Sequence, residues 1–131
     1  MQTQSHLDIT SQLGSCRSKE ETFKSLVSLS KTLPRLQTAE KNDHNKIKGC
    51  ESAVWLIIEE GNGIRYFKAD SDAKLMRGVL AALLSLVQGK SVQEIQNMDL
   101  KRELAELNLS SYLTSSRTNG VLAILDKISG R

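Results

Sequence analysis

Residues 52–88, SAVWLIIEEGNGIRYFKADSDAKLMRGVLAALLSLVQ, contain the pattern that decides the fold. The run SAVWLIIEE is rich in strand-forming residues, and the Asn62–Gly63 dipeptide that follows is the strongest short signal for a β-hairpin turn. The run IRYFKA then completes the hairpin. Alternation along the first strand predicts two faces, which carry Val54, Leu56 and Ile58 on one side and Trp55 and Ile57 on the other.

The second half of this stretch, SDAKLMRGVLAALLSLVQ, predicts the central helix of the fold, because it is apolar on most sides. Asp70 or Ser71 is expected to cap its N-terminus, and Asp72 favours the positive end of its dipole. Gly78 costs about 1 kcal/mol relative to Ala inside a helix, which indicates close packing against the sheet or the loop before the hairpin. The predicted polar stripe is narrow and consists of Lys74, Arg77, Ser85 and Gln88.

Further helices are predicted on both sides of this stretch. The run SKEETFKSLVSLSKTL begins with a capping box, Ser18 to Glu21, and Pro34 ends it. Residues 35–48 form a polar connection whose NKIKG end can make a short strand. Helices are also predicted in SVQEIQNM, which opens with a second capping box, Ser91 to Glu94, and in LKRELAEL and SSRTNGVLAILDKIS. No repeat or linker divides the chain, so residues 1–131 are expected to form a single domain.

Composition and charge argue against several classes of protein. The net charge of +3 comes from 18 basic and 15 acidic residues, and the five aromatics are not interleaved with basic residues. Nucleic-acid binding is therefore not expected. No apolar run has membrane-spanning length, and the start MQTQSHLDIT does not resemble a signal peptide. We expect a cytoplasmic protein without a membrane partner, in which cysteines are thiols.

Metal and phosphate-binding motifs are not apparent in the sequence. The two cysteines are 34 positions apart and the two histidines 38, so neither C-x-x-C nor H-x-x-x-H occurs. No metal and no cofactor are expected, because structural zinc needs closely spaced ligands and both glycine-rich phosphate motifs are missing. A Cys–His hydrolase would require His44 or His6 to dock on a thiol, and neither position favours this.

Cys50 is the candidate for chemistry. A cysteine at this place can be a small buried hydrophobe, but three features favour a functional thiol. Gly49 allows the backbone to turn, Lys46 and Lys48 bring positive charge, and the position is a loop-to-strand boundary. Cys16 has none of these surroundings and is interpreted as a packing or surface residue.

Three blocks in order and at matching spacing resemble one known family. The blocks GCESAVW, DSDAKLMRGVLAALL and LTSSRTNG, with Leu33–Pro34 at the end of the first long helix, are similar to the SufE family of sulfur acceptors. The resemblance runs from about residue 20 to residue 128. The run RGVLAALLSLVQGKSVQEI is closer to the CsdE branch than to SufE proper.

This resemblance implies an α+β fold, with a small antiparallel β-sheet and helices packed mainly on one face, as in the IscU scaffold proteins. It implies that Cys50 takes sulfane sulfur, as a persulfide, from a pyridoxal-phosphate-dependent cysteine desulfurase of the SufS or CsdA type. The protein would stimulate that desulfurase and pass the sulfur to a downstream acceptor, towards Fe–S cluster assembly or a tRNA-modification relay. The supporting residues implied are Gly49, Glu51, Asp72 and Arg117.

Two other functions remain open at this point. The chain could be an adaptor that activates a desulfurase by docking, with Cys50 only structural, or a scaffold of the IscU type. A scaffold needs several cysteines that converge on iron, whereas one cysteine here is suited to chemistry. We expect a covalent carrier rather than an independent enzyme, in the form of a monomer or a weak homodimer.

Overall fold

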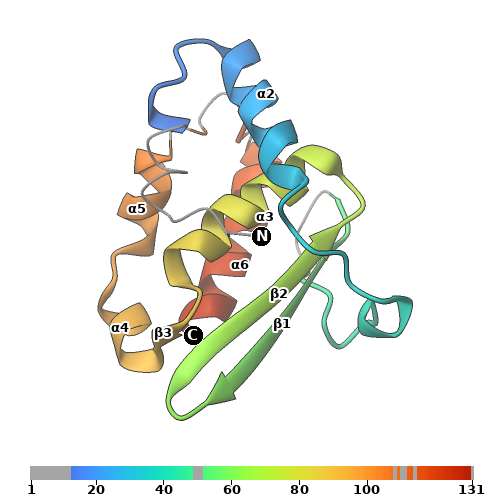
Figure 1. The fold of residues 1–131 in the computed structure, drawn as a ribbon, viewed down its shortest axis with the longest axis vertical. Helices are drawn as coiled ribbons and strands as arrows, with labels where there is room; N and C mark the ends of the chain where they lie inside the picture. The colour runs from blue at the N-terminus through green and yellow to red at the C-terminus, as the bar shows by residue number, and fades with distance from the viewer. Residues whose placement is uncertain (1–12, 49–51, 108, 110–111, 114, 131) are drawn as a thin grey trace.

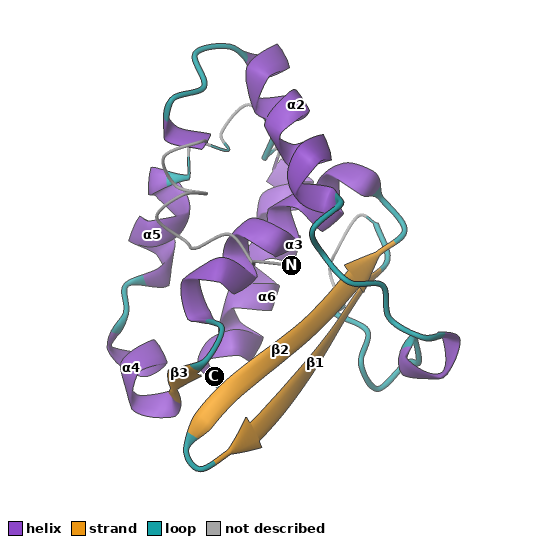
Figure 2. Cartoon of the chain, in the orientation of Figure 1, coloured by secondary structure: helices purple, strands orange, loops and turns teal. Residues whose placement is uncertain are grey.

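The computed structural model describes residues 13–48, 52–107, 109, 112–113 and 115–130. In these ranges the chain forms an α+β fold with a three-stranded antiparallel sheet of order β1-β2-β3 and five α-helices (Figure 1). The helices gather on one side of the β1–β2 hairpin (Figure 2). The predicted fold class is therefore confirmed. The elements are α2 (Lys19–Ser30), the 3-10 helix η1 (Thr38–Glu40), β1 (Val54–Gly61), β2 (Ile64–Ser71), α3 (Lys74–Val87), β3 (Lys90–Ser91), α4 (Val92–Asn97), α5 (Leu100–Glu106) and α6 (Ser115–Ser129).

The hairpin forms where the sequence predicts it. Strands β1 and β2 pair from Val54 opposite Ser71 to Gly61 opposite Ile64. The turn residues Asn62 and Gly63 have φ angles of 54° and 77°. Two positive φ angles in a two-residue loop match the right-handed twist of the strands, which explains the preference for Asn-Gly.

The two faces of β1 differ as the alternation predicts. Val54 and Leu56 are buried in the core, whereas Trp55 and Ile57 on the other face are half-buried. Ile58, closer to the hairpin turn, is 37% exposed. The part of β1 that enters the core is thus the end next to the cysteine segment.

The polar connection before the hairpin returns to the edge of β1. The Ile47 amide donates to the Val54 carbonyl at 2.8 Å, and the Leu56 amide donates to the Asn45 carbonyl at 2.8 Å. Lys46 forms an antiparallel bridge with Trp55. The short strand predicted at the NKIKG end is therefore present as a single bridge.

Helix α3 packs against α2 and β2, and Gly78 is a point of close approach to α2. A Cβ atom on Gly78 would overlap the backbone oxygen of Leu26 and would lie 2.9 Å from the Cα atom of the same residue. The expected close packing is confirmed, and among the described residues the nearest neighbour of Gly78 is the backbone of α2, where the sequence predicted the sheet or the cysteine loop. Glycine is required here because the neighbour is backbone, which cannot rotate away.

Two predicted helix ends differ in the structure. The N-cap of α3 is Ala73 without a side-chain cap bond, so neither Asp70 nor Ser71 caps the helix. Both side chains are used in tertiary contacts instead. Helix α2 ends at Ser30 with Lys31 as its C-cap, before Pro34 is reached.

Of the two predicted capping boxes, one is complete and the other is partial. At α4 the Ser91 side chain accepts from the Glu94 amide, and the Glu94 carboxylate accepts from the Ser91 amide. At α2 the Ser18 hydroxyl accepts from the Glu21 amide at 3.1 Å, but the Glu21 carboxylate accepts from the amide of Arg17.

Candidate functional site

Gly49, Cys50 and Glu51, three of the predicted site residues, lie outside the described residues. Their neighbours on both sides are described. The bond between the Ile47 amide and the Val54 carbonyl brings the two flanks together at the start of β1. The described residues on both sides of the cysteine segment therefore lie at one end of the hairpin, where β2 runs into α3.

The flank that follows the cysteine is held by the turn between β2 and α3. The Ala53 carbonyl accepts a hydrogen bond from the Ser71 hydroxyl at 2.7 Å and a longer one from the Asp72 amide at 3.4 Å. Ser71 is fully buried, whereas Asp72 is exposed. The backbone of Asp72, which the sequence predicts to lie near the cysteine loop, thus lies beside a residue three positions after Cys50.

A buried charge pair lies directly behind this turn. Asp70 has no exposed surface and Arg77 is 6% exposed, and the two side chains form an ion pair. The second oxygen of Asp70 accepts from the Leu36 amide at 3.1 Å and lies 3.3 Å from the Lys41 ammonium. Arg77, which the sequence assigned to the narrow polar stripe of the helix, is therefore buried and paired.

Arg77 connects this pair to the end of α2. Its second terminal nitrogen donates to the carbonyls of Ser30 at 3.1 Å and Leu33 at 2.5 Å. Such carbonyls at a helix end have no partner within the helix, so the guanidinium satisfies them. One side chain thereby links α3, α2 and the end of β2.

The pKa of the Asp70 carboxyl lies below its ordinary value. Burial alone would raise this pKa, but hydrogen bonds from the Leu36 and Ser71 amides and from the Arg77 and Lys41 side chains lower it by more. The carboxylate is therefore ionised at neutral pH. Asp70 is thus a fixed negative charge in the interior, and its partners Leu36, Lys41, Ser71 and Arg77 come from four segments of the chain.

Sequence reasoning missed this network, although one signal was available. Arg77 stands between apolar residues in a helix that is apolar on most sides. A charged residue at such a position must be paired when it is buried, and Asp70 at the end of the preceding strand was a candidate partner. Gln88, also assigned to the stripe, instead pairs with the backbone of Phe67 through both its amide atoms.

Arg117 lies in the first turn of α6, and Tyr112 contacts it in two ways. Its guanidinium donates to the Tyr112 carbonyl at 3.2 Å and lies 4.6 Å from the centre of the Tyr112 ring. The Tyr112 ring in turn contacts Phe23 edge to face, with ring centres 6.2 Å apart. These contacts explain an arginine at a helix end where the dipole disfavours positive charge.

Cys16 has the surroundings of a packing residue. Its thiol is half-buried and lies 3.4 Å from the Ser25 hydroxyl on α2. A half-buried position of this kind is what the interpretation of Cys16 as a packing or surface residue predicts.

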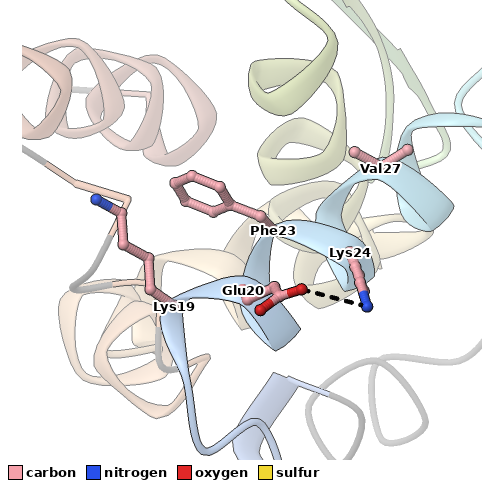
Figure 3. A pocket seen from close by; sticks show the side chains of 5 residues that line it. All are labelled: Lys19, Glu20, Phe23, Lys24 and Val27. Atoms are coloured by element: carbon pink, nitrogen blue, oxygen red, sulfur yellow. Dashed lines mark ion pairs between the residues drawn. The ribbon is translucent and has the colours of Figure 1, made fainter.

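A shallow apolar pocket lies on the outer face of α2. It is lined by Lys19, Glu20, Phe23, Lys24 and Val27 (Figure 3). Glu20 and Lys24 form an ion pair at 3.5 Å, and the Lys19 ammonium lies 5.6 Å from the Phe23 ring. The pocket extends from Lys19 to Val27 on α2, whereas the buried charge network contacts the C-terminal end of that helix.

Neither a metal centre nor a membrane span is seen in the described part of the chain. No group of three or more His, Cys, Asp or Glu side chains in these ranges is arranged to hold a metal ion. No helix within the same ranges combines the length and the apolar character needed to cross a bilayer.

Comparison with known proteins agrees with this architecture. A family model described as "SufE: Fe-S metabolism associated domain" matches residues 7–131. The fold is also similar to the solution structure of a hypothetical protein from Thermus thermophilus, with a TM-score of 0.74 and 13% sequence identity. That match covers 95% of this chain and 90% of the other. At this identity the structural match supports the fold alone.

Proposed function

The chain belongs to the SufE family of Fe–S metabolism associated domains, and from this premise we propose that it is a sulfur carrier. It accepts sulfane sulfur on Cys50 from a pyridoxal-phosphate-dependent cysteine desulfurase, stimulates that enzyme, and passes the sulfur to a downstream acceptor. The observation that supports this most strongly is the family match over residues 7–131, which includes the GCESAVW block around Cys50.

The proposed reaction is a thiol exchange at a persulfide. The Cys50 thiolate attacks the outer sulfur of the persulfide on the desulfurase, a new S–S bond forms on Cys50, and the desulfurase thiolate leaves. No external oxidant or reductant is needed, because sulfane sulfur moves from one thiolate to another. A second thiolate, on the downstream acceptor, repeats the exchange and restores Cys50.

The reactivity of Cys50 depends on its thiolate fraction. An unperturbed thiol with a pKa of about 8.5 is only about 3% ionised at pH 7. The most effective attacking thiol has a pKa near the ambient pH, because a much lower pKa weakens the nucleophile. A modest electrostatic contribution from Lys48 or Arg117 would therefore be sufficient.

The supporting residues are assigned from the family blocks and from their neighbours. Gly49 and Glu51 flank the thiol in the sequence. Asp72 is proposed as a neighbour of the cysteine loop, which is supported by the bond between its amide and Ala53. Arg117 is proposed to support the thiolate or the docking surface.

Incubation with a cysteine desulfurase and cysteine tests the proposal. Intact mass should show the gain of one sulfur atom, and peptide mapping should assign that atom to Cys50. The same sample treated with a thiol reductant should return to the original mass. No gain in mass, or sulfur assigned to Cys16, would contradict the proposed function.

A further inference from the structure

We propose that Ser71 is a positioning residue for the cysteine loop, and that the Asp70–Arg77 pair holds Ser71 in place. This inference rests on the proposed function of Cys50. It assigns a positioning role to a buried hydroxyl that does not itself take part in the reaction.

The first step of the argument is the contact between Ser71 and the loop flank. The Ser71 hydroxyl donates to the Ala53 carbonyl at 2.7 Å and accepts from the Ala73 amide at 3.2 Å. Ser71 has no exposed surface, so water does not compete for these bonds. The hydroxyl therefore links Ala53, on the flank of the cysteine segment, to Ala73, the N-cap of α3.

The second step is that Ser71 cannot easily move. Its amide donates to Asp70 Oδ1 at 2.8 Å, and the same oxygen accepts from Arg77. Arg77 is bonded to the end of α2, and the other Asp70 oxygen to Leu36 and Lys41. Displacing Ser71 would disturb a buried ionic network, and leaving one of its groups without a partner is costly.

The third step compares the two flanks of the segment. Backbone bonds from Ile47 to Val54 and from Leu56 to Asn45 join the flank before the cysteine to the flank after it. On the flank after the cysteine, the shorter of two bonds to the Ala53 carbonyl comes from a side chain. The Ser71 hydroxyl lies 2.7 Å from this carbonyl, and the Asp72 amide lies 3.4 Å from it. A single substitution at Ser71 can therefore loosen the loop while the sheet stays intact.

The consequence for sulfur transfer follows from the geometry of the attack. The thiolate must approach the outer sulfur of the persulfide along a defined line, and a displacement of about 1 Å can cost on the order of 100-fold in rate. Loss of one flank bond should widen the range of loop positions rather than displace all of them. We expect a loss on the order of tenfold in the rate of transfer.

The test compares Ser71→Ala with a matched control, Ser85→Ala. Ser85 is a partly buried serine whose hydroxyl, like that of Ser71, donates to a backbone carbonyl, that of Ala82 at 2.6 Å, but it lies within α3. Stimulation of a desulfurase is measured against carrier concentration for both variants and the wild type. Ser71→Ala should lower the maximal rate about tenfold and leave the half-maximal concentration within about twofold. Ser85→Ala should change neither quantity.

A Ser71→Ala protein that transfers sulfur at the wild-type maximal rate would overturn this inference, with the proposed function intact. An equal loss of rate in Ser85→Ala would also overturn it, because the effect would then be one of stability. A wild-type protein that takes up no sulfur would contradict the proposed function itself, and this inference with it.

Discussion

Asp70 and Arg77 form an ion pair in the interior of the protein, across the turn that joins β2 to α3. The pair lies where three segments meet: the end of the hairpin, the beginning of α3 and the end of α2. The carbonyl of Ala53, which follows the cysteine segment, accepts from the Ser71 hydroxyl, and the Ser71 amide donates to Asp70 of the pair. The end of the hairpin, the beginning of α3 and the backbone at Ala53 are therefore joined by the same network.

Replacement of Arg77 by Met should destabilise the protein strongly. It leaves the buried carboxylate of Asp70 without its guanidinium, and removal of one partner of a buried pair costs about 3–5 kcal/mol. Denaturant unfolding measures the free energy of unfolding of the variant and of the wild type. The control Lys74→Met changes an exposed residue of the same helix and should cost less than about 0.5 kcal/mol. Equal values for the two variants would contradict the role assigned to the pair.

The double variant Asp70→Asn with Arg77→Met should lose less stability than the sum of its two single variants. Removing both charges leaves no unpaired ion in the interior, so the two effects are coupled. A double-mutant cycle measures the coupling directly. Additive losses would show that the two side chains act independently.

The stabilising effect of Asp70 should be lost in acid. The folded-state pKa of its carboxyl is lowered, so its contribution is fully present above the unfolded pKa of about 3.9 and is lost as the pH falls through the folded pKa. The difference in unfolding free energy between the wild type and Asp70→Asn should therefore shrink as the pH is lowered below about 4. A difference that stays constant down to the lowest pH at which both proteins fold would contradict the assignment.

Gly78→Ala should destabilise the protein although alanine favours the helix by about 1 kcal/mol. The new Cβ would overlap the Leu26 backbone oxygen, so α2 and α3 must separate, and overpacking of this kind costs about 1–3 kcal/mol or more. The matched control is Gly61→Ala, where a Cβ meets nothing within 4 Å. Thermal or denaturant unfolding measures the change in stability of each of the two variants. A stabilised Gly78→Ala protein would show that the two helices do not approach as described.

Arg117→Ala should slow sulfur transfer and lower the melting temperature by only a few degrees. The side chain loses one hydrogen bond and its contact with the Tyr112 ring, and a cation–π contact of this kind contributes about 0.5–1 kcal/mol. The control Arg102→Ala removes an arginine whose side chain is 77% exposed and pairs with Glu106. Equal transfer rates for Arg117→Ala, Arg102→Ala and the wild type would remove Arg117 from the site.

The hairpin and the central helix could be predicted because their determinants are local. Asn62 and Gly63 specify the turn themselves, and alternation along β1 specifies which side chains enter the core. The apolar pattern of α3 also predicts its position to within a few residues. Each of these signals is contained in a short piece of sequence and needs no knowledge of the partner.

The buried network could not be predicted in the same way, because its partners are distant in sequence. Arg77 bonds to Ser30 and Leu33, more than forty positions earlier. Asp70 resembles a helix cap locally, but its side chain accepts from the Leu36 amide, 34 positions earlier, and pairs with Arg77. Tertiary contacts thus override local preference at the turn that holds the cysteine flank.

The assignment of the candidate site residues stays a prediction from the sequence. Cys50, Gly49 and Glu51 lie outside the described residues and remain predictions from the sequence. The structure places the backbone of Asp72 beside Ala53, and it gives Arg117 a contact with Tyr112. Sequence reasoning offered Ser71 as a helix cap. It missed the bond from the Ser71 hydroxyl to the Ala53 carbonyl, because this acceptor is eighteen positions away.

The most direct test of the central claim is desulfurase turnover with Cys50→Ser and Cys16→Ser, together with mapping of the transferred sulfur. Serine is close in size to cysteine, so both variants should fold. Cys50→Ser should abolish both sulfur uptake and stimulation, because the desulfurase stalls until its own persulfide is discharged, whereas Cys16→Ser should behave as the wild type. Full stimulation by Cys50→Ser, with the sulfur on Cys16 or on neither residue, would contradict the carrier function.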